Sequence, residues 1–460
     1  MQIRTRGVLR HAALVLALAS AFGPALAHAD ETREAALEQR IDELERQLQD
    51  LMAEVRAQRA APPATPVAAS APLPKATETA GGKPPIQQTT ITPAANPNTT
   101  FRVGGFVKAD FMATRTGDGQ LADSAVGRAL YVPSQIPVGG DGSGTDYDAH
   151  AKFSRFNIGV DSVTDDGHKL GAFFEMDFFG NALGNQNATN TYGVTVRHAY
   201  AYWDGWLAGQ TWSNFADVAA LPETVDFIGP TDGVLFVRQA QLRYTTGGFS
   251  VSIENPETTI IPNGGGAIIA SDRGALPDLT LRYGWKGAWG SFGIGGLLRE
   301  LRIDRNATAD VAAIDDSSFA GAFTVGGKWN IGSSDDLRYQ LTVGNGFSRY
   351  VGLGITGDSM LDADGDLDAL GGVAGFVGWR HAFSPKLRSN VVFARSQYDN
   401  DDALTGGGVT RNVQSWRVNL LYSPLPKLDI GAELMYGQRE LEDGRDGDLT
   451  RLQFTTKYSF

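Results

Sequence analysis

Arginine and lysine recur at alternate positions near the C-terminus and in many earlier segments of the chain. In the last ten residues, Arg451 and Lys457 share a parity with Gln453, Thr455 and Ser459, and the positions between them are mostly apolar or aromatic. In a β-strand, this alternation places the cations on one face and the apolar groups on the other. A guanidinium group donates two parallel hydrogen bonds to a carboxylate, so such a face predicts chemistry with small organic anions.

The same parity assigns cations to the polar faces of earlier segments. If those faces line a water-filled passage, the predicted lumen and substrate-path residues are Lys108, Arg155, Arg197, Arg243, Arg282 and Arg417, with Arg338, Arg388, Arg451 and Lys457 on the same parity. Carboxylates share these faces at Asp110, Asp161, Glu175, Asp177, Glu254 and Glu433. Rings of arginine favour anion passage. The alternative is that the cations pair with these acids and only brace the wall.

The segments that carry these residues predict an all-β fold. About sixteen alternating stretches, most of them close to the 9–11 residues that a tilted membrane strand requires, lie near 101–115, 153–163, 169–180, 191–203, 206–213, 235–245, 248–255, 278–285, 288–302, 318–329, 336–346, 370–382, 386–398, 411–422, 427–438 and 449–460. Their connections alternate between short and long, which is typical of outer-membrane barrels. A soluble β-sandwich has no physical reason for this alternation. We therefore predict an antiparallel transmembrane β-barrel of about 16 strands.

The chain before the barrel divides into three zones. Residues 1–29 have a basic head, a short apolar run and an Ala-x-Ala end, which predicts a signal peptide cleaved before Asp30. Residues 30–59 carry a heptad seam with Leu37, Leu44 and Leu51 at d, which predicts a short periplasmic α-helical coiled coil, a trimer by its pattern. Residues 60–100 are rich in Pro, Ala and Thr and predict an extended linker. The barrel then covers residues 101–460.

Composition excludes several classes of function. The net charge of −12 argues against a nucleic-acid partner, and the absence of cysteine removes disulfides and thiolate metal sites. The six histidines are scattered and no Gly-x-Ser-x-Gly motif occurs, so we predict neither an enzyme nor a cofactor. An outer-membrane phospholipase that uses His198 and a nearby serine is the catalytic alternative.

An acidic run provides a weak candidate for a metal site. Asp362, Asp364 and Asp366 alternate in a segment that contains Gly365. An EF-hand loop places its glycine at the sixth position, whereas here it is at the fourth. A solvated acidic loop is therefore the favoured interpretation.

Three stretches carry a resemblance to a known family. They are Trp206–Phe215, which contains Gly-Gln-Thr-Trp, Leu221–Thr224, which reads Leu-Pro-Glu-Thr, and Asp226–Tyr244, which ends in Arg-Gln-Ala-Gln-Leu-Arg-Tyr. With the order of signal peptide, coiled coil, linker and barrel, the chain resembles the DcaP-like porins. The resemblance implies a homotrimer, a preference for anions such as dicarboxylates, and an inward-folded third loop. Asp217, Glu223 and Asp226 would then be constriction-loop residues.

Together these observations predict an outer-membrane porin of a Gram-negative bacterium that allows passive diffusion of small anionic solutes, with dicarboxylates as the expected class. The expected partners are two further copies of the chain, outer-membrane lipid and the barrel assembly machinery, which reads a terminal aromatic such as Phe460. A general diffusion porin without anion preference is one alternative. Another is an envelope-spanning tether, in which the coiled coil and linker reach towards peptidoglycan.

Overall fold

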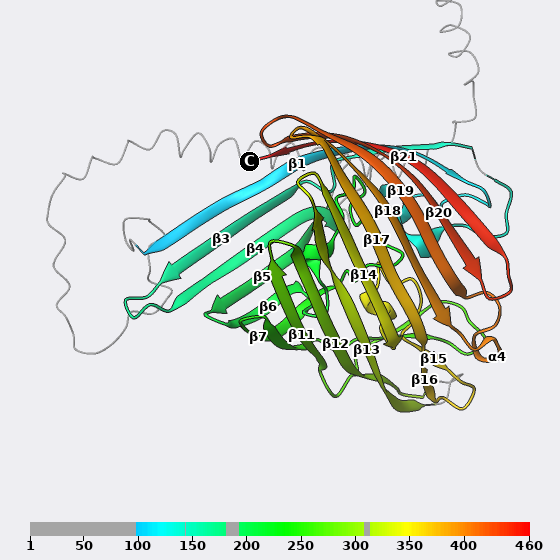
Figure 1. Ribbon diagram of the computed structural model, residues 1–460. Helices are drawn as coiled ribbons and strands as arrows, with labels where there is room; N and C mark the ends of the chain where they lie inside the picture. The colour runs from blue at the N-terminus through cyan, green and yellow to red at the C-terminus, as the bar shows by residue number, and fades with distance from the viewer. Residues whose placement is uncertain (1–97, 143, 181–192, 308–312) are drawn as a thin grey trace, which may run out of the picture. The chain divides into compact units, whose positions relative to one another are not determined.

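A closed wall of strands, paired in sequence order, dominates the computed structural model, which describes residues 98–142, 144–180, 193–307 and 313–460 (Figure 1). The wall strands are β1 (Thr99–Thr116), β3 (Arg155–Val163), β4 (Lys169–Gly180), β5 (Gly193–Trp203), β6 (Trp206–Trp212), β7 (Arg238–Thr246), β8 (Phe249–Glu254), β11 (Asp278–Gly287), β12 (Gly290–Arg305), β13 (Ile314–Ile331), β14 (Asp335–Asn345), β17 (Gly371–Ser384), β18 (Leu387–Asp399), β19 (Thr410–Leu425), β20 (Leu428–Leu441) and β21 (Asp446–Ser459). Each is antiparallel to its neighbours, and β21 pairs with β1 from Phe106↔Ser459 to Thr116↔Leu449, which closes the wall. The predicted sixteen-stranded antiparallel barrel is confirmed.

The predicted strands and the observed ones correspond one to one. The stretch predicted at 288–302, for example, is β12. The sequence did not reveal five short strands in the long connections, β2 (Asp146–His150), β9 (Thr258–Ile261), β10 (Ile269–Ser271), β15 (Ser359–Leu361) and β16 (Leu367–Ala369). It also did not reveal single-turn helices at α3 (Val126–Ala129), η3 (Pro133–Gln135), η4 (Val218–Ala220), η5 (Ser348–Tyr350) and α4 (Asp402–Thr405).

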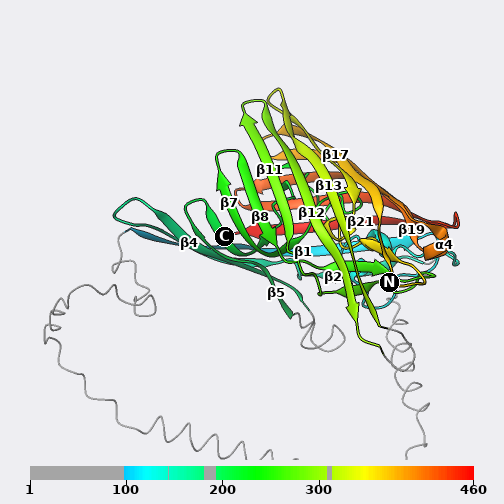
Figure 2. The same cartoon turned by 90° about the horizontal axis from the view of Figure 1, so that it is seen from below.

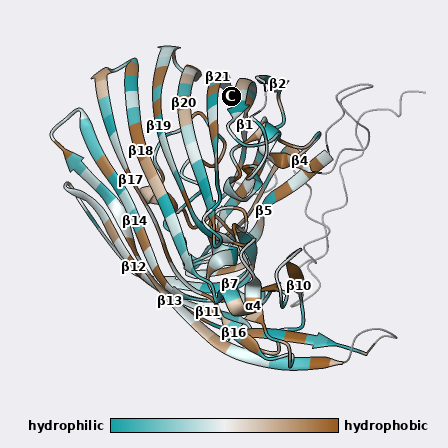
Figure 3. Cartoon of the chain, turned by 90° about the vertical axis from the view of Figure 1, so that its right-hand side faces the viewer, coloured by the Kyte–Doolittle hydropathy of each residue, from teal (hydrophilic) through white to brown (hydrophobic). Residues whose placement is uncertain are grey.

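Side chains alternate between the two faces of the wall. In β19, Trp416 and Val418 are exposed on the outer face, whereas Ser415, Arg417 and Asn419 between and beside them are buried on the inner face. The bands of opposite hydropathy along β17 to β20 in Figure 3 follow from this period of two. The outer face therefore suits lipid, and the polar groups face inward.

Tryptophans mark the ends of the strands that are joined by short turns. Trp203 and Trp206 flank the β5–β6 turn, Trp285 and Trp289 lie at the β11–β12 turn, and Trp329 lies near the end of β13. All five are exposed on the outer surface. Aromatic girdles of this kind lie at the level of lipid head groups, and short turns are typical of the periplasmic end of outer-membrane barrels. We therefore call this end the periplasmic rim.

One sector of the wall is built from short strands. β6, β7 and β8 contain 7, 9 and 6 residues, whereas β12 and β13 contain 16 and 18. Figure 2 shows β7 and β8 beside the longer β11, β12 and β13. The wall is therefore lower in this sector than at β12 and β13.

The predicted signal peptide, coiled coil and most of the linker lie outside the described residues. No helix among the residues that the structure describes is long and apolar enough to cross a bilayer.

The C-terminal residue provides a test of how the wall is assembled. The backbone N–H of Phe460 donates to the carbonyl of Gly105 at 3.1 Å, and its ring is exposed on the apolar parity of β21. A charge close to the interface costs a folded barrel only about 0–1 kcal/mol. We expect Phe460→Asp to lower the yield of outer-membrane protein without changing the thermal unfolding of the protein that inserts, and Phe460→Leu to lower the yield less. Equal yields of wild type and Phe460→Asp would show that the terminal aromatic does not direct assembly.

Candidate functional site in the barrel lumen

The connection between β6 and β7, residues 213–237, leaves the wall and crosses the inside of the barrel. Near its start, Asn214 donates from its backbone N–H to Glu254 of β8 at 2.8 Å and from its side chain to Thr280 of β11 at 3.0 Å. Further along, the backbone N–H of Val225 donates to Glu433 of β20 at 2.9 Å. Because β8 and β20 lie far apart around the wall, this lumen segment must span the interior.

Three acidic residues of the lumen segment are held in different ways. Asp217 caps η4 by accepting from Ala219 N at 3.1 Å, and its other oxygen lies 2.7 Å from Arg282 Nη2. Asp226 is buried and accepts backbone N–H groups from Ile228 and Gly229. Its second oxygen accepts from the backbone N–H of Tyr131, in the connection that follows β1, at 3.0 Å.

Glu223 is the most exposed of the three acids, and it contacts the wall through arginine. Arg388 donates to both of its carboxylate oxygens, from Nε at 2.7 Å and from Nη2 at 2.5 Å. Arg380 approaches one of them at 3.7 Å. The side chain of Glu223 remains 34% exposed, so solvent reaches this ion pair.

Three of the predicted lumen cations are buried and paired with acids. Arg197 lies 2.9 Å from Glu175 and 2.9 Å from Asp177 on the neighbouring strand. Lys108 contacts Asp110 and donates to the carbonyl of Val225 at 3.1 Å. Such pairs anchor the wall and the lumen segment, and their charges are largely neutralised where they stand.

Arg417 joins the lumen segment to the wall. Its Nη1 lies 3.9 Å from Asp226 and 3.8 Å from Glu433, and its side chain is 1% exposed. Nε and Nη1 make no hydrogen bond, and the guanidinium lies over the ring of Tyr131. It therefore belongs with Lys108 and Arg197 as a buried cation on the inner face.

The other three predicted cations remain in contact with solvent. Arg155 lies 3.5 Å from Glu175 and has its guanidinium over the ring of Phe106. Arg243 donates to Gln241 and to the carbonyl of Trp212. Arg282, paired with Asp217, keeps 28% of its side chain exposed. Their part in a substrate path stays a prediction.

A larger group of partly exposed charges lies on the inner face near the periplasmic rim. This rim cluster consists of Lys328, Arg338, Arg380, Arg388 and Lys457 with the acids Asp336, Asp429 and Glu223. Five cations face three carboxylates, so the cluster has an excess of two positive charges. Each wall member is close to a short turn, at the end of β13, β17 or β21 or at the start of β14, β18 or β20.

Part of the rim cluster was not predicted from the sequence. Arg380 and Lys328 were not assigned to the inner face. The signal for Arg380 was present, because Val377 and Trp379 alternate with Gly378 and Arg380 in β17. The ion pair of Arg388 with Glu223 joins a strand and a connection that are 165 residues apart in sequence, and no local pattern predicts such a pair.

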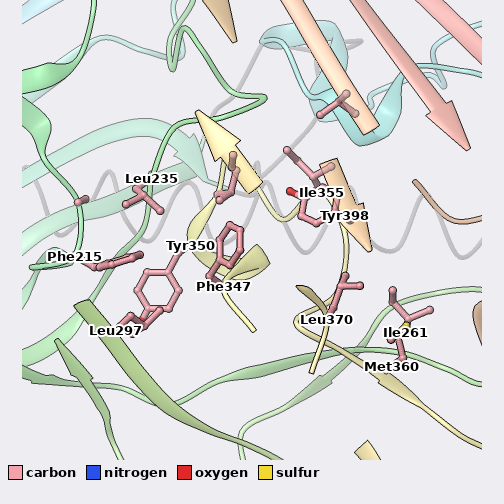
Figure 4. Close-up of a cluster of buried hydrophobic side chains, with 14 residues drawn as sticks. Phe215, Leu235, Ile261, Leu297, Phe347, Tyr350, Ile355, Met360, Leu370 and Tyr398 are labelled. Carbon is pink, nitrogen blue, oxygen red and sulfur yellow. The ribbon is translucent and has the colours of Figure 1, made fainter. Parts of the chain in front are cut away.

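The long-loop side of the lumen is tightly packed. Arg299 of β12 lies 3.3 Å from Asp278 and 3.1 Å from Asp358, all three side chains being fully buried. Tyr350 of η5 donates its hydroxyl to Asp278 at 2.7 Å. An apolar cluster adjoins this network, and in Figure 4 the ring of Tyr350 lies between Leu235 and Leu297, with Phe215 on one side and Phe347 on the other.

The acidic run in the connection between β15 and β16 forms a turn. Asp362 Oδ1 accepts the backbone N–H groups of Asp364, Gly365 and Asp366 at 2.8–2.9 Å. Asp362, the first aspartate of the run, therefore has backbone N–H groups as its hydrogen-bond partners and needs no ion to satisfy it. Among the described residues, no group of histidine and acidic side chains has the arrangement of a metal site.

His198 is tied to the wall. Its Nδ1 lies 2.9 Å from Thr211 Oγ1, and its Nε2 lies 3.8 Å from Glu175. Within the part of the chain that the structure describes, no serine hydroxyl is hydrogen-bonded to this ring. The geometry therefore lends no support to the phospholipase alternative.

Comparison with known proteins settles the family, since residues 104–460 match the family model described as DcaP outer membrane protein. The chain belongs to the DcaP outer membrane protein family. The crystal structure of the outer membrane channel DcaP of Acinetobacter baumannii is similar in fold, with a TM-score of 0.63 at 24% identity over 79% of this chain and 98% of that one. No curated protein matches.

Other solved structures match with TM-scores below 0.5. They include a loop-deletion variant of OmpT of Vibrio cholerae, at 13% identity and a TM-score of 0.47 over 79% of this chain and all of that one. Another is an anion-selective porin from Comamonas acidovorans, at 12% identity and a TM-score of 0.46 over the same shares of the two chains. By family and fold, the chain is an outer-membrane porin.

The buried network around Arg299 provides a test of what stabilises the long-loop side. Arg299→Met leaves Asp358 buried without a cation and Asp278 with only Arg349, 3.6 Å away. Breaking a buried pair in this way costs about 3–5 kcal/mol. We expect a clearly lower temperature for the heat-induced mobility shift on gels. Arg302→Met, on the same strand, removes a partly exposed pair with Asp315 and should cost about 0–1 kcal/mol. Equal transition temperatures for the two variants would contradict the assigned role of Arg299.

Proposed function

We propose that this porin allows passive diffusion of small anions in preference to cations, with dicarboxylates as the class of solute that its lumen fits best. The observation that carries the proposal is the charge excess of the rim cluster, together with the partial exposure of its cations. Lys328 and Lys457 are both 34% exposed, and Arg380 is 27% exposed. Cations that keep contact with water can attract a passing anion, and arginine forks match carboxylates.

The buried cations contribute less to this preference. Lys108, Arg197 and Arg417 are each surrounded by acids of the wall or of the lumen segment. A neutralised pair creates little field beyond its own neighbourhood, whereas the rim cluster has an unbalanced charge. The proposal therefore assigns selectivity mainly to the rim cluster, with Arg155, Arg243 and Arg282 as further cations along the path.

Ion selectivity tests this proposal directly. Lys328→Gln and Lys457→Gln together remove the two excess charges without touching the lumen segment. We expect the zero-current potential of purified protein in planar bilayers under a KCl gradient to be anion-selective for wild type and to move towards zero in the double variant. High salt should reduce the difference, because the Debye length falls to about 3 Å at 1 M.

A matched control removes a cation from the outer face. Arg395 of β18 is exposed on the outer parity and bonds only Gln397, so Arg395→Gln should leave the potential unchanged. A wild-type channel that prefers potassium over chloride at low ionic strength would contradict anion preference. A general diffusion porin would then be the better description.

We also propose that the protein is a homotrimer whose subunits meet along the low sector of β6 to β8. Strands of 6, 7 and 9 residues are at or below the length of about 9–11 residues that spans the hydrocarbon layer. Apolar side chains such as Leu242 and Ile253 are exposed on the outer face there. A neighbouring barrel would cover this sector more completely than lipid.

A charge placed on that sector tests the assembly. Leu242→Arg on β7 should shift the particle from trimer to monomer, as measured by light scattering in detergent, because an unpaired charge in an apolar interface is costly. Leu434→Arg on β20 is the matched control, since Leu434 is exposed to a similar degree, 50% against 43% for Leu242, on another part of the wall. Loss of the trimer in both variants, or in neither, would show that the interface does not lie along β6 to β8.

A further inference from the structure

The stretch Leu221–Thr224 of the lumen segment lies against four neighbouring strands at the rim cluster. The carbonyl of Leu221 accepts from Arg338 of β14, and the carbonyl of Glu223 accepts from Asn419 of β19 at 2.8 Å. Pro222 packs on Gly378 of β17 so closely that a Cβ at position 378 would lie 3.0 Å from the ring. The backbone of this stretch is therefore fixed by contacts that do not involve the Glu223 side chain.

The carboxylate of Glu223 occupies the arginine fork of the rim cluster. Arg388 holds it through two hydrogen bonds and Arg380 adds a third cationic nitrogen at 3.7 Å. A carboxylate delivered by a solute would adopt the same two-point geometry at this fork. Two of the three remaining N–H donors of Arg388 bond elsewhere, to Ser423 at 2.7 Å and to Asp429 at 3.3 Å, so they keep the fork in place if Glu223 leaves.

We propose that Glu223 is an internal competitor for this fork, displaced by the carboxylate of a permeating solute and returning when the solute moves on. The inference rests on the proposed anion preference and adds a residue that tunes it. With Glu223 turned towards water, the remaining cations outnumber Asp336 and Asp429 by three, so a dianion is held better than a monoanion.

The exchange explains how a strongly cationic site can still conduct. An empty fork beside several cations would bind a dicarboxylate tightly, and a solute that binds tightly blocks the pore. When Glu223 competes, the binding free energy of a solute carboxylate is only the difference between its ion pair with Arg388 and the ion pair that Glu223 makes with Arg388. Binding stays shallow because one carboxylate replaces another, and the fork is never left without a partner.

Block of conductance by succinate in planar bilayers measures this competition. Glu223→Gln keeps the size of the side chain but removes its charge. We expect the succinate concentration for half-block to fall about fivefold, which corresponds to about 1 kcal/mol, and the half-block by acetate to change much less. Glu440→Gln, which removes a carboxylate paired with Arg411 at the opposite end of the wall, should leave block unchanged.

Two further variants keep the inference open to contradiction. Glu223→Asp shortens the side chain by one methylene and should weaken its grip on Arg388, so succinate block should lie between wild type and Glu223→Gln. In an Arg388→Ala background, Glu223→Gln should have no further effect. If wild type is anion-selective but none of these substitutions at Glu223 changes succinate block, the competitor role is wrong and the proposed function stands. If wild type is cation-selective, the proposed function itself fails.

Discussion

A lipid bilayer offers no hydrogen-bond partner to a backbone amide, and the rest of this structure depends on that constraint. A sheet with a free edge would leave a row of N–H and C=O groups unpaired in hydrocarbon. The pairing of β21 with residues Phe106–Thr116 of β1 removes this free edge. The first residues of β1, Thr99–Gly105, pair with β3 on one side only. Once the wall is closed, the alternation of side chains along each strand determines which residues face lipid and which face the lumen. The outward residues must suit lipid, and the inward residues can be polar.

Closure also determines how charges can be used inside. A cation that the lumen segment covers loses water and must find an acid, which is the situation of Arg417 beside Asp226 and Glu433. A cation near the short turns keeps part of its hydration, as Lys328 does. The same residue type therefore stabilises packing in one place and creates a field in another, and the depth of burial separates the two roles.

The sequence could predict the wall almost completely, because alternation is a local property of each strand and the short turns are equally local. The inward position of Arg197 followed from the same parity. Its partners could not be predicted with the same security, because Glu175 and Asp177 come from another strand and the bulge between β4 and β5 shifts the register there. The ion pair of Glu223 with Arg388 was still harder to predict from the sequence, because no periodic pattern specifies where an irregular connection will lie.

The acidic character of the whole protein and the cationic character of its rim are compatible for a physical reason. A net charge of −12 describes the entire chain, in which acids gather in connections such as Asp362–Asp368, whereas a solute inside the barrel responds to charges within about 10 Å at 0.1 M salt. Near the short turns, the charges within that range are those of the rim cluster, which includes the carboxylate of Glu223. The proposed selectivity is thus a local property, in which one loop carboxylate placed among wall arginines would influence a solute more than many acids in the long connections.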